Sequence, residues 1–213
     1  MKSWLVCFLF LISCKLETSV SNGSVDPVID KTIGDFTLVT QEGEEVTDQY
    51  FLDKIVVSSF FFTECEQICQ SVQDNLLEVY EHFLTNEDVK ILSHSILPEK
   101  DNIKVLFDYS GKLSVNNKEW YFLTGKKDVL NKIMKNDYLL NPEELQSNPE
   151  QLQTIFLIDQ ENKIKGSYQG NDKSDIKRLI SDIDKLILLQ KQKENQDLIN
   201  KMHILNLKKN GNL

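Results

Sequence analysis

The chain has 213 residues, enough for one folded domain with a substantial hydrophobic core. Its composition is that of a globular protein, with 40% hydrophobic and 27% charged residues, and no run of 18 apolar residues predicts a conventional transmembrane helix. The formal net charge of −9 argues against nucleic acid as a partner, because surfaces that bind nucleic acid carry excess positive charge.

The first residues predict a lipoprotein signal peptide. Lys2 precedes the apolar residues 4–12, which is the pattern of a secretory signal. The sequence LISC then has the form of a lipoprotein processing box that ends at Cys14. We expect Cys14 to carry lipid and hold the protein at a membrane surface, since each buried CH₂ contributes roughly 0.8 kcal/mol. The alternative is an ordinary signal peptide that leaves Cys14 as a spare thiol.

The composition divides the chain into four parts. Residues 1–13 are the predicted signal peptide, and residues 14–31 are rich in small polar residues, which is typical of a flexible tether. We expect residues 32–189 to form the folded domain. Residues 190–213 are a lysine-rich tail that we expect to be either a helical extension or disordered.

The elements of the domain alternate between strands and helices. In chain order we expect a hairpin at 35–47, strands at 54–62 and 89–97, and a helix from 68 to 83 between them. The later segments are a turn and helix that begin at 98 and end at Gly111, a strand at 119–125, a helix at 126–135, a polar loop at 141–150, a strand pair at 153–170 and a helix at 172–190. This order predicts an α/β fold with a mainly parallel central sheet, an N-terminal β-hairpin and a C-terminal helix.

Two cysteines follow the predicted central strand. Thr63 and Glu66 have the spacing of a capping box, which would place Cys65 in the first turn of the next helix. Cys69 would lie one turn later on the same face. The helix N-terminus favours a thiolate there, although the neighbouring Glu64 and Glu66 oppose it. Both sulfurs can reach one point, which suits a disulfide, a thiol–disulfide exchange pair or a two-thiolate Cu(I) site.

A purely structural disulfide is the plainest alternative, because paired cysteines outside the cytoplasm usually form one. A crosslink across so short a loop removes little unfolded-state entropy, and the carboxyl end of a central strand is where open α/β sheets bind ligands. We therefore favour a chemical role for the pair. Zinc is disfavoured, because it usually takes three or four protein ligands. A peroxidase would need an arginine near the thiolate, and the only arginine, Arg178, lies in the last predicted helix.

The sequence resembles the Sco/SenC family over residues 32–187. The resemblance rests on the order and spacing of DFTLVTQEGEEVT, VVSSFFFTECEQIC, ILSHSILPEKDNIKVL, EWYFLTG and IFLIDQENKIKGSYQG. LSHSILPE is similar to the Bacteroidetes branch in particular. The family implies a thioredoxin-like fold and a membrane-tethered protein involved in copper delivery to cytochrome c oxidase. It also implies that Cys65 and Cys69 bind copper, for which two thiolates favour Cu(I) over Cu(II).

Several positions depart from the family pattern. The family's third copper ligand is a histidine, and the matching position here is Gln151, whose neutral amide is a poor ligand for Cu(I). Glu66 and Gln70 replace the usual prolines of the cysteine motif, and Leu97 replaces the aspartate of a DPE motif. His94 lies in the second buried strand, where we expect a core histidine or a neighbour of the site.

Two functions remain open from the sequence. The first is a metallochaperone that handles copper during assembly of the cytochrome c oxidase copper site. The second is a copper-independent thiol–disulfide oxidoreductase. In either case the expected partner is an oxidase subunit or another extracytoplasmic thiol or copper protein, met at the periplasm-facing membrane surface. A surface lipoprotein without chemistry is a third reading, against which the retained cysteine pair argues.

Overall fold

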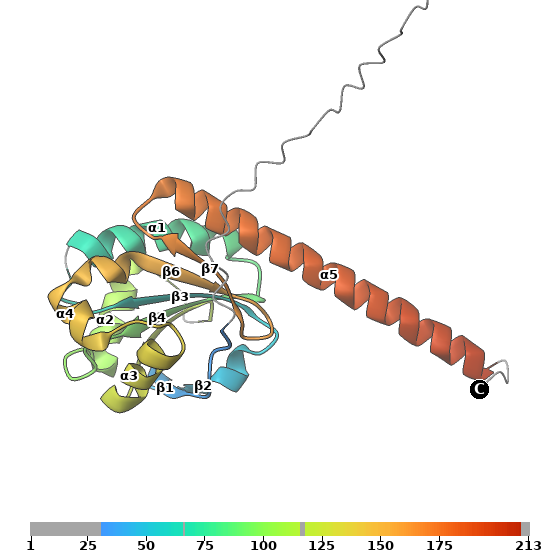
Figure 1. The fold of residues 1–213 in the computed structure, drawn as a ribbon, viewed down its shortest axis with the longest axis horizontal. Coiled ribbons are helices and arrows are strands. Elements are labelled where there is room, and N and C mark those ends of the chain that lie inside the picture. Colours follow the sequence, from blue (N-terminus) through green and yellow to red (C-terminus); the bar gives the residue numbers. More distant parts are fainter. Residues whose placement is uncertain (1–30, 66, 116–117, 210–213) are drawn as a thin grey trace, which may run out of the picture.

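The computed structural model describes residues 31–65, 67–115 and 118–209, which form one domain with a long C-terminal helix (Figure 1). The predicted signal peptide, the predicted lipidation site Cys14 and the predicted tether up to residue 30 lie outside the described residues. The boundary between tether and domain at residues 31 and 32 stays a prediction.

A seven-stranded sheet in the order β2-β1-β5-β4-β3-β6-β7 forms the middle of the domain. The strands are β1 (Thr37–Thr40), β2 (Glu45–Thr47), β3 (Ile55–Phe61), β4 (Val89–Ser95), β5 (Trp120–Thr124), β6 (Thr154–Ile158) and β7 (Ile164–Gln169). The helices are α1 (Gln67–Phe83), α2 (Ile103–Leu113), α3 (Lys127–Asn136), α4 (Pro142–Ser147) and α5 (Lys173–Lys209), with short 3₁₀ segments η1 (Asp48–Phe51) and η2 (Pro149–Gln153). The predicted α/β fold class, with its N-terminal hairpin and C-terminal helix, is confirmed.

Strand β3 is the buried centre of the sheet. All seven of its residues are buried, and it pairs with β4 on one side and β6 on the other. The Phe61 ring packs against Tyr109 of α2, with ring centroids 5.4 Å apart. Phe60 points to the opposite face and contacts Tyr138, which follows α3, at 4.8 Å. Helices therefore cover both faces of β3, which explains its uninterrupted apolar sequence.

The sheet is less parallel than we expected. Only the pairings β3–β4 and β4–β5 are parallel, whereas both flanks of the sheet are antiparallel. The short connections within β1–β2 and β6–β7 impose antiparallel directions on those pairs. The chain also enters β6 from η2, which packs against β3, so that β6 runs back along β3. The parallel part is thus confined to the three central strands.

The segment at 141–150, which we expected to be a polar loop, instead forms α4 and η2. The Asn141 side chain accepts a hydrogen bond from the Glu143 amide, and Pro142 occupies the first helical turn. Asn148 and Pro149 begin η2 in the same way. Asparagine and proline are common at the start of helices. The segment was nevertheless predicted as a loop because most of its residues are polar. Leu145 is fully buried and ties α4 to the core.

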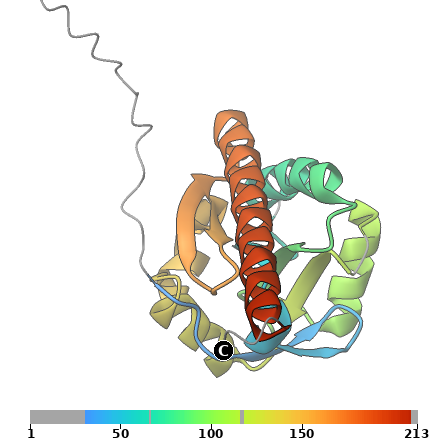
Figure 2. The ribbon, with the colours of Figure 1, turned by 90° about the vertical axis from the view of Figure 1, so that its right-hand side faces the viewer.

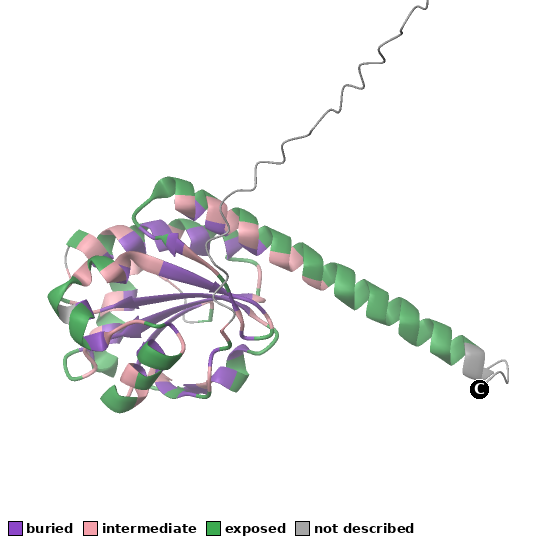
Figure 3. Cartoon of the chain, in the orientation of Figure 1, coloured by how far each residue is buried: buried purple, intermediate pink, exposed green. Residues whose placement is uncertain are grey.

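Helix α5 continues from the domain through most of the predicted tail. Its first turns pack on the domain through the buried residues Ile176, Leu179 and Ile183, and α5 also contacts α1. From Leu188 to Leu205 its large apolar side chains are exposed, and Figures 1 and 3 show this part of the helix extending beyond the domain. Figure 2 views the domain from the side on which α5 ends. Within residues 31–209, apart from the undescribed gaps, no helix combines the length and apolar character needed to cross a membrane.

Gly170, directly after β7, fits closely between α1 and β6. A Cβ atom there would lie 2.8 Å from Ile155 Cδ1 and 2.9 Å from both Val72 Cγ1 and the Gln153 carbonyl oxygen. The Gly170 amide also donates to the Gln153 carbonyl at 2.6 Å, and its own carbonyl accepts from Asn75 Nδ2 at 2.7 Å. This close approach fixes η2 and the start of β6 beside α1.

We expect Gly170→Ala to lower the free energy of unfolding by about 1–3 kcal/mol, because the added methyl group overpacks a site formed partly by backbone. Urea unfolding of both proteins measures the change. Gly111→Ala in α2 is the matched control, since a Cβ there would meet nothing within 4 Å. It should leave stability unchanged or raise it by up to about 1 kcal/mol. Equal effects of the two substitutions would contradict the role of Gly170.

Candidate functional site

The two cysteines of the motif form a disulfide at the carboxyl end of β3. Cys65 and Cys69 are joined with an S–S distance of 2.08 Å and a Cα–Cα distance of 5.5 Å. Cys69 lies in the first turn of α1, and Cys65 lies in the segment between β3 and α1. The sequence prediction that the two sulfurs meet is therefore confirmed, and the disulfide faces the end of the sheet where α/β folds carry ligand sites.

The two sulfurs differ in their exposure. Cys69 is 1% exposed and belongs to the core cluster with Val72 and Leu76 of the same helix. Cys65 is only partly buried and packs at the edge of that cluster. An external thiol or metal carrier can thus reach Cys65 first, because Cys69 has almost no exposed surface.

The predicted capping box between Thr63 and Glu66 stays a prediction. Helix α1 is described from Gln67, two residues after Cys65, and Glu66 lies outside the described residues. The Thr63 hydroxyl donates to the Asp101 carboxylate at 2.5 Å. The Cys65 amide donates to the Phe62 carbonyl at 3.0 Å, so Cys65 lies in a turn before the helix.

Asp101 is a buried anchor for this turn that the sequence analysis missed. Its carboxylate is 1% exposed and accepts hydrogen bonds from the Thr63 amide at 3.2 Å, the Thr63 hydroxyl at 2.5 Å and the Ser95 hydroxyl at 2.6 Å. Asp101 thereby joins the segments that follow β3 and β4. The signal in the sequence is its place soon after the second of two buried parallel strands, whose carboxyl ends meet at one edge.

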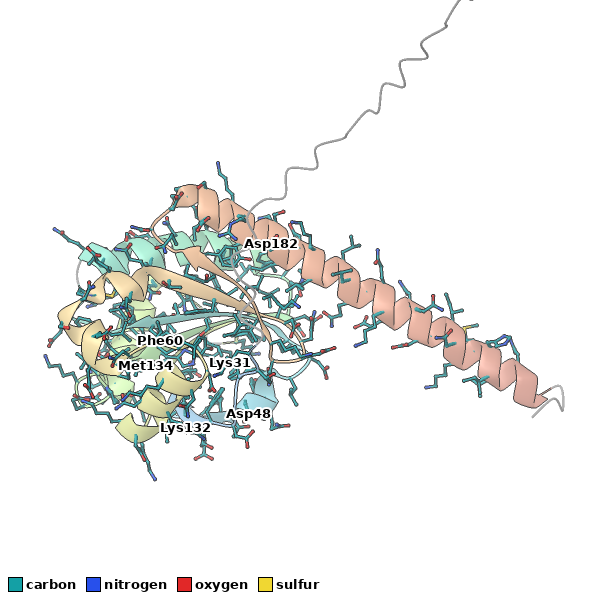
Figure 4. The ribbon with its side chains drawn as sticks, in the orientation of Figure 1. Lys31, Asp48, Phe60, Lys132, Met134 and Asp182 are labelled. Atoms are coloured by element: carbon teal, nitrogen blue, oxygen red, sulfur yellow. A yellow bond between two sulfur atoms is a disulfide. The ribbon has the colours of Figure 1, made fainter. Side chains whose placement is uncertain are left out.

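His94 is a core histidine and does not contact the disulfide. It is 1% exposed, its ring stacks on Phe60 with centroids 5.0 Å apart, and its Nδ1 lies 3.2 Å from the Ser59 carbonyl oxygen. Figure 4 shows Phe60 in the interior of the domain. Burial lowers the pKa of His94 to about 4, so the ring is neutral at physiological pH. Of the two sequence interpretations of His94, the structure supports the core residue.

Gln151, at the expected position of the family histidine, lies in η2, which packs against both α1 and β3. Its side chain is partly buried and lines a polar groove with Asn148, Thr154 and Gln169, in which neither cysteine takes part. Among the residues that the structure describes, no three His, Cys, Asp or Glu side chains gather in an arrangement that could hold a metal ion. In the described chain the metal-binding potential of the site therefore rests on the two sulfurs.

Arg178 is engaged away from the disulfide. Its guanidinium lies 4.2 Å from the centre of the Tyr168 ring and donates to the Ser167 carbonyl at 3.1 Å. It also pairs with Asp175 at 3.1 Å. These partners belong to β7 and the start of α5, so the arginine that a peroxidase would need beside its thiolate is held elsewhere.

The comparison with protein families identifies the chain. The SCO1/SenC family model matches residues 26–188, which is most of the described domain. The chain belongs to the SCO1/SenC family. The resemblance noted in the sequence is thus confirmed, whereas the correspondence between Gln151 and the family histidine stays a prediction.

Three solved structures of SCO1/SenC proteins share the fold. A SCO1/SenC family lipoprotein from Bacillus anthracis str. Ames is 22% identical with a TM-score of 0.65, covering 77% of this chain and 99% of that protein. BsSco, a cytochrome c oxidase assembly protein with a disulfide switch, is 22% identical with a TM-score of 0.63, covering 75% and 95%. Yeast Sco1 with copper bound is 21% identical with a TM-score of 0.60, covering 74% and 92%. At this level of identity the likeness establishes the shared fold.

The low pKa of His94 makes stability depend on pH. The pKa of His94 is 6.5 in the unfolded chain and about 4 in the folded chain. At pH values between these two, the unfolded chain binds more protons at this residue than the folded chain does. Stability from neutral His94 is therefore fully present above pH 6.5 and is lost as the pH falls toward 4. We expect this residue to lower the free energy of unfolding by up to about 3 kcal/mol over that range.

Urea unfolding at a series of pH values, together with NMR titration of the His94 ring, checks this expectation. His94→Asn should flatten the dependence of the free energy of unfolding on pH between 6.5 and 4. A ring midpoint near 6.5 in the folded protein would contradict the assignment of His94 as a buried neutral residue.

Proposed function

We propose that this chain is a membrane-anchored extracytoplasmic protein whose Cys65–Cys69 pair handles Cu(I) and exchanges thiols for disulfides during assembly of the cytochrome c oxidase copper site. The observation that carries the proposal is the disulfide at the carboxyl end of β3, with one accessible and one buried sulfur, in a SCO1/SenC family member. The copper-bound yeast Sco1 and the disulfide switch of BsSco support the two chemistries.

The unequal burial of the sulfurs sets the order of thiol exchange. In the reduced chain the Cys65 thiolate attacks one sulfur of a partner disulfide, and the other partner sulfur leaves as a thiolate that takes a proton from water. The Cys69 thiolate then attacks Cys65 Sγ and releases the first partner sulfur as the second thiolate. Two electrons pass from the chain to the partner, and the Cys65–Cys69 disulfide of the structure is the oxidised product.

Copper is cargo in this proposal. The reduced pair offers two thiolates about one helical turn apart, a soft donor set that suits the low coordination number of Cu(I). The disulfide form has no thiolate to offer, so oxidation of the pair and binding of copper exclude each other. The partner's copper-site cysteines are suited to both exchanges, because they can receive electrons as a disulfide or Cu(I) as thiolates.

The second candidate is a thiol–disulfide oxidoreductase that does not bind copper stably. It is favoured by the absence of a third His, Cys, Asp or Glu ligand beside the sulfurs in the described part of the chain. Two-thiolate binding leaves Cu(I) with an open position that competing ligands can attack. Thiol exchange needs no third ligand, so it would persist if copper binding were lost.

A Cu(I) titration of reduced residues 31–213 against a competing chelator, without oxygen, separates the candidates. This chain retains every buried apolar residue of the described structure, which spans Ile33 to Ile183. We expect one tightly bound Cu(I) per chain, lost in both Cys65→Ser and Cys69→Ser, because a single thiolate gives a much weaker site. Absence of binding by the reduced wild-type chain, with exchange retained, would establish the copper-independent candidate.

The same two variants test the order of exchange with glutathione disulfide. Cys69→Ser should accumulate a mixed disulfide through Cys65, because no second thiol resolves it. Cys65→Ser should react at least tenfold more slowly, since Cys69 is 1% exposed. If both variants react equally fast, the assigned roles of the two sulfurs are wrong.

We further propose that a lipid on Cys14 anchors the mature protein on the outer side of the cytoplasmic membrane. The LISC box supports this, as does the lipoprotein nature of the Bacillus anthracis protein. In cells, Cys14→Ser should prevent lipid attachment and move the protein from the membrane fraction toward the soluble fraction. Metabolic labelling with a fatty acid is the direct measurement, and unchanged labelling of the variant would refute Cys14 as the modified residue.

A further inference from the structure

The second half of α5 carries an apolar stripe that no described residue covers. Leu198, Ile199, Met202 and Leu205 are each 55–59% exposed. At about 100° per residue these four side chains span roughly 120° of the helix circumference, which is the width of an amphipathic face. Figure 3 shows this part of α5 as exposed beyond the domain.

The stripe points away from the domain. On the side of α5 that faces the β6–β7 turn, Gln190 Oε1 accepts a hydrogen bond from Gln160 Nε2 at 2.9 Å, and Lys193 Nζ lies 3.8 Å from Glu161. Met202 follows Lys193 by nine residues, which places it on the opposite side of the helix, about 180° away. The domain therefore cannot cover the stripe without a break in the helix.

The charge of this segment differs in sign from that of the chain. Residues 190–213 contain five lysines and two acidic residues, a net side-chain charge of +3, whereas the whole chain has a net charge of −9. A helix with an apolar face and surrounding lysines is typical of segments that lie in a membrane interface. Lysines near an anionic bilayer strengthen such binding by electrostatic attraction.

The described chain begins beside the place where α5 leaves the domain. The Lys31 carbonyl accepts from the Ile164 amide at 2.9 Å, and the Ile33 amide donates to the Asn162 carbonyl at 2.8 Å. Glu161 of the same turn contacts Lys193 of α5. Figure 4 labels Lys31 and, on α5, Asp182. A fully extended tether from Cys14 to Lys31 would be at most about 60 Å long. The part of α5 beyond Gln190 is roughly 30 Å long. The lipid on Cys14 and this part of α5 can therefore contact the same membrane.

A second copy of the chain fits the stripe less well. The heptad positions before Leu198 are occupied by Lys191 and Asn195, so the apolar seam of a coiled coil would be only about one heptad long. Stable interfaces between proteins bury about 800 Å² on each partner, far more than four side chains on one helix supply. The net positive charge of the segment also opposes pairing with itself.

We propose that residues 190–209 of α5 lie on an anionic lipid surface, with the apolar stripe among the acyl chains and the lysines at the headgroups. This contact is additional to the lipid on Cys14 and independent of the chemistry of Cys65 and Cys69.

Co-sedimentation of residues 31–213 with lipid vesicles tests the proposal without the lipid anchor. Vesicles of phosphatidylcholine with 30% phosphatidylglycerol are compared with vesicles of phosphatidylcholine alone. We expect binding to the anionic vesicles that weakens at high salt and is at least tenfold weaker in the double variant Leu198→Ser/Met202→Ser. The double variant Gln196→Ser/Asn200→Ser is the control, because it changes two exposed residues of the opposite face that bond each other at 3.1 Å.

The control should bind within about twofold of the wild type, and neither variant should change the urea unfolding midpoint of the domain, since all four positions are exposed beyond it. Three results would overturn the proposal: no binding of the wild type to anionic vesicles, equal loss in both double variants, or a wild-type dimer in light scattering that only Leu198→Ser/Met202→Ser dissociates. The last result would assign the stripe to a second copy. Copper binding and thiol exchange are measured separately, so they do not depend on this outcome.

Discussion

The burial of β3 on both faces is the constraint on which the rest of the structure depends. Phe61 packs toward α2 and Phe60 toward α3, so neither face of the strand can turn to solvent. Its neighbours β4 and β6 pair with the backbone N–H and C=O groups along its two edges. The chain can leave this central position only at the end of the strand, and it leaves directly into the turn that carries Cys65. The position of the reactive pair therefore follows from the packing of the core.

The same packing makes the two cysteines chemically different. Cys69 lies on the buried face of α1, where Val72 and Leu76 continue the apolar side of the helix. Cys65 closes a turn in which Thr63 is held by the buried carboxylate of Asp101. One sulfur is thus fixed in the core and the other is presented at the surface on an anchored turn. This arrangement suits both stepwise exchange and transfer of a soft metal ion through Cys65.

The strong local patterns of the sequence predicted most of the fold. Strands β3 and β4 were predicted from their apolar runs, and helix α1 from the spacing of Ile68, Val72 and Leu76. In these elements the pattern of buried residues matches one type of secondary structure. The segment at 141–150 was missed because its helix-starting asparagines and prolines are also typical of loops, and Leu145 alone marks its burial. Contacts between distant segments were not predictable from one sequence. Asp101 and Thr63 are 38 residues apart, and only the parallel pairing of β3 and β4 brings them together.

The proposed cysteine chemistry and the proposed membrane contact lie at opposite ends of the central sheet. The disulfide lies at the carboxyl end of β3, whereas the β6–β7 turn lies at its amino end, where the Asp53 amide donates to the Gln160 carbonyl at 3.2 Å. The first described residue and the departing part of α5 both meet that turn. A membrane held by the tether and by α5 would therefore engage the domain from the end opposite the cysteines. Because the sheet separates the two ends, Cys65 would remain accessible to a partner while the protein stays bound to lipid.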